Sequence, residues 1–214
     1  MLDLAQFTLA AGAVGTAAMG IAEGFKSVKM RPIGFSKLEK SINWADAALI
    51  KAYGNERMML LESLYRSNRS SGDLPRILRQ GVRIGLDEQN AVEMENILLG
   101  ADRNQLPAVA KKAAIGKELE QEEQNILGRF EVAADARIDA ALSLAERAYI
   151  NGIRLRAFII ALSLSLSAAF TIKPDKEGIV AGLIVGLVAV PLAPIAKDVA
   201  DGIKEAAKAI GGKS

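Results

Sequence analysis

The chain contains neither histidine nor cysteine. These two residues supply the commonest general base, the thiol nucleophiles and the usual ligands of zinc and haem iron. The sequence also has no Walker A loop, no G-x-G-x-x-G pattern and no G-x-S-x-G pattern. We therefore expect a protein that is not an enzyme and that binds no cofactor and no metal ion.

Three long windows of the sequence, 4–22, 157–172 and 178–196, lack aspartate, glutamate, lysine and arginine. As α-helices they would extend over roughly 24 to 29 Å, close to the hydrocarbon thickness of a bilayer. The alternative for each window is a buried helix of a soluble bundle. Window 178–196 has no polar side chain to face water, which favours a membrane span. The alanine- and glycine-rich window 4–22 is less hydrophobic, so its insertion stays open.

Basic residues at the ends of these windows predict the orientation in the membrane. Several follow the first window and several precede the second: Lys26, Lys29, Arg31, Lys37, Lys40, Arg147, Arg154 and Arg156. Basic flanks remain on the cytoplasmic side. We therefore expect a cell-membrane protein with its N-terminus outside and its C-terminus in the cytoplasm.

The predicted fold is an all-α integral membrane protein. We expect a transmembrane helix over 1–24, a cytoplasmic helical domain over 25–152, transmembrane helices over 153–173 and 178–196, an external turn over 174–177, and an amphipathic C-terminal helix over 197–214. Pro191 and Pro194 are expected to kink or end the last span. The hairpin formed by the last two spans does not depend on the first.

Helical patterns run through the whole middle region. Ser36 and Glu39 form a capping box, which predicts the start of a helix, and Asp87 is placed to cap another helix. Between about 117 and 149, apolar residues recur every three, four or seven positions without a proline. This spacing predicts a long amphipathic helix that continues towards the second span.

The sequence ALSLSLSAAF at 161–170 alternates leucine with serine, which is typical of a half-buried strand. A strand inside a membrane must belong to a closed barrel of many such segments, and the other segments of this chain have helical patterns. We therefore predict a helix here. Ser163 and Ser167 would then lie on one face, where they bond backbone carbonyls or face a neighbour or a pore.

Small residues recur about once per helical turn in each window, which is the pattern of a glycine zipper. Such stripes let helices approach closely, either within one chain or between copies, and the sequence leaves both possibilities open. We expect the second window to receive the glycine stripe of the third. The predicted packing residues are Gly12, Thr16, Gly20, Ala157, Ala161, Ser165, Ala168, Gly178, Gly182, Gly186 and Ala189.

Arginines are concentrated between positions 57 and 83. Because the guanidinium fork suits phosphate, anionic lipid headgroups are the predicted ligand; the alternative is ordinary surface charge paired with acidic helices. Nucleic acid is not expected, since only Tyr65 is available for stacking. The run Glu118, Glu120, Glu122 and Glu123 is interpreted as a solvated helix face. The arginines predicted to contact lipid are Arg66, Arg69, Arg76, Arg79 and Arg83.

Two classes of function fit these features. The favoured one is a non-enzymatic integral membrane protein that self-associates or docks through small-residue helix faces and binds a partner with its cytoplasmic helices, as an anchor, assembly or structural subunit. The alternative is an oligomeric channel or pore former, with Ser163 and Ser167 lining the conduit. In both cases the expected partners are the lipid bilayer and either further copies of the chain or other subunits of a membrane complex.

Overall fold

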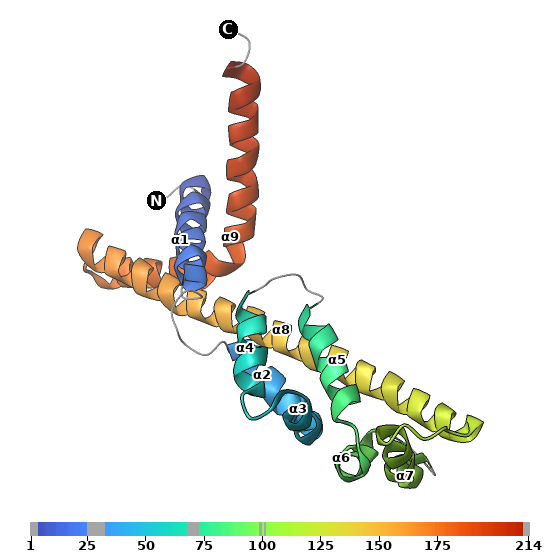
Figure 1. The fold of residues 1–214 in the computed structure, drawn as a ribbon. Coiled ribbons are helices and arrows are strands. Elements are labelled where there is room, and N and C mark those ends of the chain that lie inside the picture. Colours follow the sequence, from blue (N-terminus) through green and yellow to red (C-terminus); the bar gives the residue numbers. More distant parts are fainter. Residues whose placement is uncertain (1–3, 25–32, 68–72, 99, 101, 212–214) are drawn as a thin grey trace. The chain divides into compact units, whose positions relative to one another are not determined.

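The computed structural model describes the backbone of residues 4–24, 33–67, 73–98, 100 and 102–211, and the side chains of residues 10–22, 34–67, 73–98, 100 and 102–193. Every regular element in these residues is helical (Figure 1), which confirms the predicted all-α class. The alternating segment ALSLSLSAAF lies inside a long helix, as predicted, because its neighbours on both sides continue the helical backbone.

The chain divides into two compact units. The central unit comprises Arg31–Tyr149, and the terminal unit comprises Met1–Met30 together with Ile150–Ser214. The longest helix, α8 (Gln121–Ile172), contributes its first part to the central unit and its last part to the terminal unit. The helix expected over 117–149 therefore begins at Gln121 and does not end before the second apolar window.

The terminal unit is built from α1 (Leu4–Gly24), the end of α8, and α9 (Lys176–Gly211), with α1 packed against α9. The helix expected over 197–214 is not a separate element, because α9 continues through Pro191 and Pro194 to Gly211. Figure 1 shows the ribbon of α9 changing direction part-way along its length. Proline removes a backbone donor and kinks long helices in this way.

Two helices of the described chain, α8 and α9, contain stretches that are long and apolar enough to cross a membrane. The described side chains of α1 form a shorter apolar helix over Ala10–Ala22. The side chains of residues 4–9 lie outside the described residues, so the first predicted span stays a prediction.

The described residues of the central unit form eight further helical elements and the first part of α8. They are α2 (Ile33–Ser41), a 3₁₀ turn (Asn43–Ala45), α3 (Asp46–Tyr53), α4 (Arg57–Ser67), α5 (Asp73–Gly85), α6 (Glu88–Met94), a second 3₁₀ turn (Glu95–Ile97) and α7 (Asp102–Ala114). The capping box predicted at Ser36 was wrong, because α2 begins at Ile33 and Ser36 lies inside it. Phe35, buried beside the ring of Tyr65 at 5.8 Å between centroids, favours this earlier start.

Large apolar side chains fill the core of the central unit. The helix α8 contributes a stripe at helical spacing that includes Ile126, Phe130 and Ile138, all fully buried. Side chains such as Leu61 and Leu78 from α4 and α5 belong to the same core. Burial of each large side chain contributes roughly 1.5 to 3 kcal/mol, so this unit has the hydrophobic interior of an ordinary helical domain.

Two glycines let α5 approach α3 closely. A Cβ on Gly81 would lie 2.5 Å from Cε2 of Tyr53, and a Cβ on Gly85 would overlap the backbone carbonyl of Ala48. The hydroxyl of Tyr53 in α3 donates to the backbone carbonyl of Ile77 in α5 at 2.7 Å, which is a second contact between these two helices. The short distance between the helix backbones therefore depends on the absence of side chains at these positions.

Asp87 caps α6 as predicted. Its Oδ1 accepts a hydrogen bond from the backbone N–H of Asn90 at 2.8 Å, and its Oδ2 pairs with Nζ of Lys51 at 2.5 Å. The amide of Asn90, followed by Lys51, lowers the pKa of this carboxyl below its ordinary value. A lowered carboxyl pKa contributes stability at neutral pH that is lost as the pH falls through the folded-state pKa.

Replacing Gly85 by alanine is expected to lower the free energy of unfolding of the central unit by roughly 1 to 3 kcal/mol, because the new methyl group meets backbone that cannot rotate away. Trp44, the only tryptophan in the sequence, packs against the central core and reports unfolding by fluorescence. Gly128→Ala on α8 is the control, since its Cβ meets nothing within 4 Å. Equal stability of the two variants would contradict the close crossing.

Candidate functional site

The last part of α8 and the first part of α9 meet through small residues, and we call the contact made by Ser165, Ala169, Gly182 and Gly186 the hairpin seam. A Cβ on Gly182 would lie 2.7 Å from Cβ of Ala169, and a Cβ on Gly186 would lie 2.5 Å from Oγ of Ser165. Ser165 is 4% exposed, and its hydroxyl donates to the carbonyl of Leu162 at 3.1 Å. The polar atom is thus satisfied inside its own helix while the two helices touch.

Other small residues extend this contact along both helices. On α8, Ala157 and Ala161 are buried at the spacing predicted for the groove. Ala168 is exposed, and the neighbouring Ala169 takes the position expected for it. On α9, the predicted stripe of Gly178, Gly182, Gly186 and Ala189 lies entirely on the buried face.

The first helix uses a different stripe from the predicted one. A Cβ on Gly15 would overlap the carbonyl of Ala189, and Ala18 belongs to one buried cluster with Ala161 and Ala189. Gly12 is also buried. Thr16 is exposed and its hydroxyl bonds the carbonyl of Gly12 at 2.8 Å, while a Cβ on Gly20 would meet nothing within 4 Å. Thr16 and Gly20 are therefore not packed against the described side chains of this unit.

The turn between α8 and α9 is closed by polar contacts. Oδ1 of Asp175 accepts from the backbone N–H of Gly178 at 2.8 Å, and this bond lowers the pKa of the carboxyl. Lys173 pairs with Glu177 at 2.6 Å. These contacts hold the first turn of α9 and leave the charged side chains exposed.

The two serines proposed for a pore lie on the exposed side of α8. The hydroxyl of Ser163 donates to the carbonyl of Ile159 at 2.9 Å. The backbone carbonyl of Ser167 accepts from the hydroxyl of Thr171 at 2.9 Å. Hydrogen bonds of this kind within a helix let a hydroxyl residue face an apolar environment.

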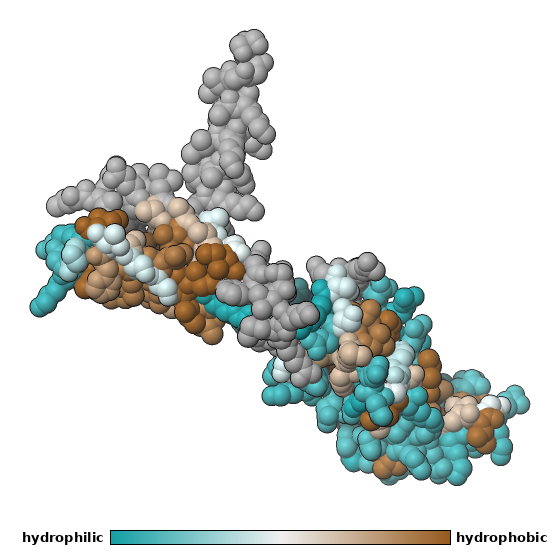
Figure 2. All heavy atoms as spheres, turned by 60° about the vertical axis from the view of Figure 1, so that its left-hand side comes forward, coloured by the Kyte–Doolittle hydropathy of each residue, from teal (hydrophilic) through white to brown (hydrophobic). Residues whose placement is uncertain are grey.

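Large apolar side chains of the terminal unit point outwards. Ile159 is 56% exposed, Phe170 58% and Leu187 51%, whereas the buried positions among the described side chains of this unit are occupied by alanine, glycine and Ser165. In Figure 2 the visible described surface of this unit is mostly hydrophobic, and that of the central unit is mostly hydrophilic. The terminal unit therefore buries small side chains and exposes large apolar ones, which is the reverse of a water-soluble core.

The arginines predicted to contact lipid are paired with carboxylates in the central unit. Arg66 binds Glu62 at 2.7 Å and Arg76 binds Asp73 at 3.2 Å. Arg69 lies outside the described residues. The charge of these guanidinium groups is largely compensated, as the alternative of ordinary paired surface charge expects.

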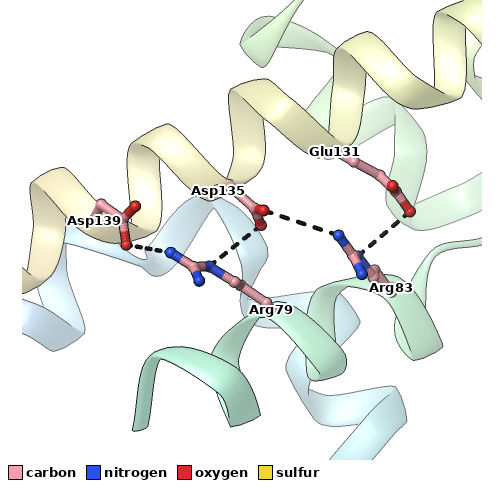
Figure 3. Close-up of polar contacts among 5 residues, drawn as sticks. All are labelled: Arg79, Arg83, Glu131, Asp135 and Asp139. Atoms are coloured by element: carbon pink, nitrogen blue, oxygen red, sulfur yellow. Dashed lines mark hydrogen bonds and ion pairs between the residues drawn. The ribbon is translucent and has the colours of Figure 1, made fainter. Parts of the chain in front are cut away.

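The remaining two arginines, Arg79 and Arg83, face an acidic stripe of α8 (Figure 3). Arg79 contacts Asp139 at 2.5 Å and Asp135 at 3.5 Å. Arg83 contacts Glu131 at 3.4 Å and Asp135 at 3.9 Å. This ladder attaches α5 to α8 and accounts for both arginines without a ligand.

Among the described residues, no group of three or more acidic side chains is placed to hold a metal ion. The acidic run was expected to be a solvated helix face, which is wrong for Glu118 and Glu120 because α8 begins only at Gln121. Glu123 lies on α8 and pairs with Lys112, which lowers the carboxyl pKa. A shallow depression near the start of α8 is lined by Arg129 and otherwise by uncharged residues, including Gly128, Val132 and Ala136. No family model, curated protein or solved structure matches the chain.

Replacing Gly186 by leucine is expected to destabilise the hairpin by roughly 1 to 3 kcal/mol, because the side chain would have to enter the space of Ser165 and Leu162. The loss of helical circular dichroism during an SDS titration of the detergent-solubilised protein measures this. Gly20→Leu is the matched control, with nothing near its Cβ. If Gly186→Leu unfolds at the same SDS fraction as Gly20→Leu, the hairpin seam is wrongly placed.

Proposed function

We propose that the chain is a non-enzymatic integral membrane protein, whose terminal unit lies in the bilayer and whose central unit binds a partner as an anchor, assembly factor or structural subunit. The membrane part of this proposal is supported by one observation: the terminal unit buries its small side chains and exposes its large apolar ones. Helices in lipid gain nothing from hiding leucine or isoleucine, and they associate through small residues that allow close contact. Exposed Ile159, Phe170 and Leu187 around buried Ser165 and Gly186 fit this environment.

The same contacts favour an anchor over a pore. A conduit needs polar groups that face water, whereas the hydroxyl of Ser163 is already bonded to its own helix. Large apolar side chains such as Ile159 lie beside it on the exposed face. The orientation that we propose, with the turn at residues 173–177 outside and the central unit in the cytoplasm, follows from the basic flanks.

The absence of native cysteine makes membrane insertion testable with single-cysteine variants. Leu144 and Leu164 both lie on α8, and their exposed fractions are similar, at 46% and 40%. In native membranes a water-soluble maleimide is expected to label Leu144→Cys and to leave Leu164→Cys unlabelled, because lipid covers the second position. Both variants are expected to react after SDS denaturation. Equal labelling of the two cysteines before denaturation would mean that water surrounds the terminal unit.

The shallow depression on α8, which is lined by Arg129 and otherwise by uncharged residues, supports the partner-binding part of the proposal. Val132 is 71% exposed there, beside the small residues Gly128 and Ala136. An exposed apolar side chain above small neighbours gives another helix room to approach. A partner that docks at this face would bury Val132.

A photo-reactive amino acid at Val132 is expected to cross-link one reproducible partner in native membranes, and Ala136→Arg is expected to abolish this adduct by placing a charge in the depression. Met59→Arg is the control, since Met59 is 64% exposed on another helix. The cross-linked bands are measured by immunoblot and mass spectrometry. Failure to obtain a reproducible adduct, or equal loss in both variants, would count against a partner at this face.

A further inference from the structure

The arginines of α8 differ in their partners. In the central unit, Arg129 pairs with Asp102 at 2.5 Å and Arg137 donates to the carbonyl of Asn96 at 3.1 Å, whereas Arg147 makes neither an ion pair nor a hydrogen bond with a described side chain. In the terminal unit, Arg154 and Arg156 make neither an ion pair nor a hydrogen bond with any described side chain. A guanidinium without a compensating carboxylate keeps its full capacity to bind an anion.

Both of these arginines lie where α8 becomes apolar. Arg156 directly precedes the uncharged run 157–172, and the apolar side chains of Leu155 and Ile159 are 62% and 56% exposed around it. In a bilayer, such apolar side chains enter the hydrocarbon while a nearby arginine extends its head group to the interface. The two guanidinium groups would therefore reach the depth of the lipid phosphates.

We infer that Arg154 and Arg156 bind the phosphate groups of anionic phospholipids. The inference rests on the proposed membrane location of the terminal unit. The planar fork of arginine matches two phosphate oxygens, and a basic residue near an anionic surface is attracted to it. This assignment moves the lipid contact away from Arg66, Arg76, Arg79 and Arg83, whose carboxylate partners are part of the fold.

The helical register makes the two contacts independent. Two residues along an α-helix are rotated by about 200°, so Arg154 and Arg156 lie on nearly opposite sides of α8. Each arginine would then meet a different headgroup. Independent contacts predict that the effects of the two substitutions multiply in the binding constant.

The test uses the full-length protein reconstituted in phosphatidylcholine vesicles that contain a trace of spin-labelled phosphatidylglycerol or spin-labelled phosphatidylcholine. Lipids at a protein surface give a motionally restricted electron paramagnetic resonance component. The ratio of the restricted fractions for the two labels measures the preference for the anionic lipid. We expect the unmodified protein to prefer phosphatidylglycerol, and this preference to decrease at high salt.

Arg154→Gln and Arg156→Gln are each expected to lower the preference by up to about fivefold, and the double variant by the product of the two single effects. The matched control is Arg66→Gln with Arg76→Gln, which removes two positive charges from the central unit and is expected to leave the preference unchanged. An unchanged preference in the Arg154→Gln/Arg156→Gln variant, or an equal loss in the control, would overturn the inference alone. Absence of a restricted component for either labelled lipid would overturn it together with the proposed membrane location.

Discussion

Direct contact between the backbones of α8 and α9 at Gly182 and Gly186 is the constraint on which the terminal unit depends. Any side chain at these glycines would meet Ser165 or Ala169, so the helices approach only because nothing projects between them. Close approach fills the interior with alanine, glycine and one serine. The leucine, isoleucine and phenylalanine side chains of the same helices are consequently left on the outside. An exterior of this kind is stable in lipid and costly in water.

The central unit, which is also helical, has the opposite arrangement, with large apolar side chains buried and charged side chains on its surface. Its core contains fully buried Phe35, Phe130 and Ile138, and its surface carries ion pairs. Close helix contact occurs there as well, at Gly85 against Ala48, but large side chains still surround it. Glycine contacts alone therefore do not distinguish the two units. The position of the large side chains distinguishes them.

The charged residues agree with this contrast. Arg79 and Arg83 are held by the carboxylates of α8, so the basic face of α5 contributes to the stability of the central unit. Arg154 and Arg156 have no described partner and lie at the start of the apolar run. Arginines that the sequence alone does not distinguish thus have different roles, according to the acidic residues that the fold brings near them.

Periodicity predicted the helical class and the continuation of the long helix towards the second apolar window, but not that α8 begins at Gln121 and runs unbroken to Ile172. It did not predict that Gly15 and Ala169 pack in place of Gly20 and Ala168. In α1 small residues occur on every side, so spacing alone does not select the contact face. Ala169 follows Ala168 directly, and this shift of one residue corresponds to a rotation of only about 100° about the helix axis. The pairing of Arg79 with Asp139 joins residues far apart in sequence, so only the folded arrangement of α5 and α8 identifies it.

The central claim is that the outward face of the terminal unit contacts hydrocarbon. A spin label at Leu187, which is 51% exposed in the middle of the apolar part of α9, tests it most directly in the reconstituted protein. If the account is correct, the label collides more often with oxygen, which concentrates in the bilayer, than with a water-soluble nickel chelate. More frequent collision with the nickel chelate would show that water surrounds this face and would contradict the account.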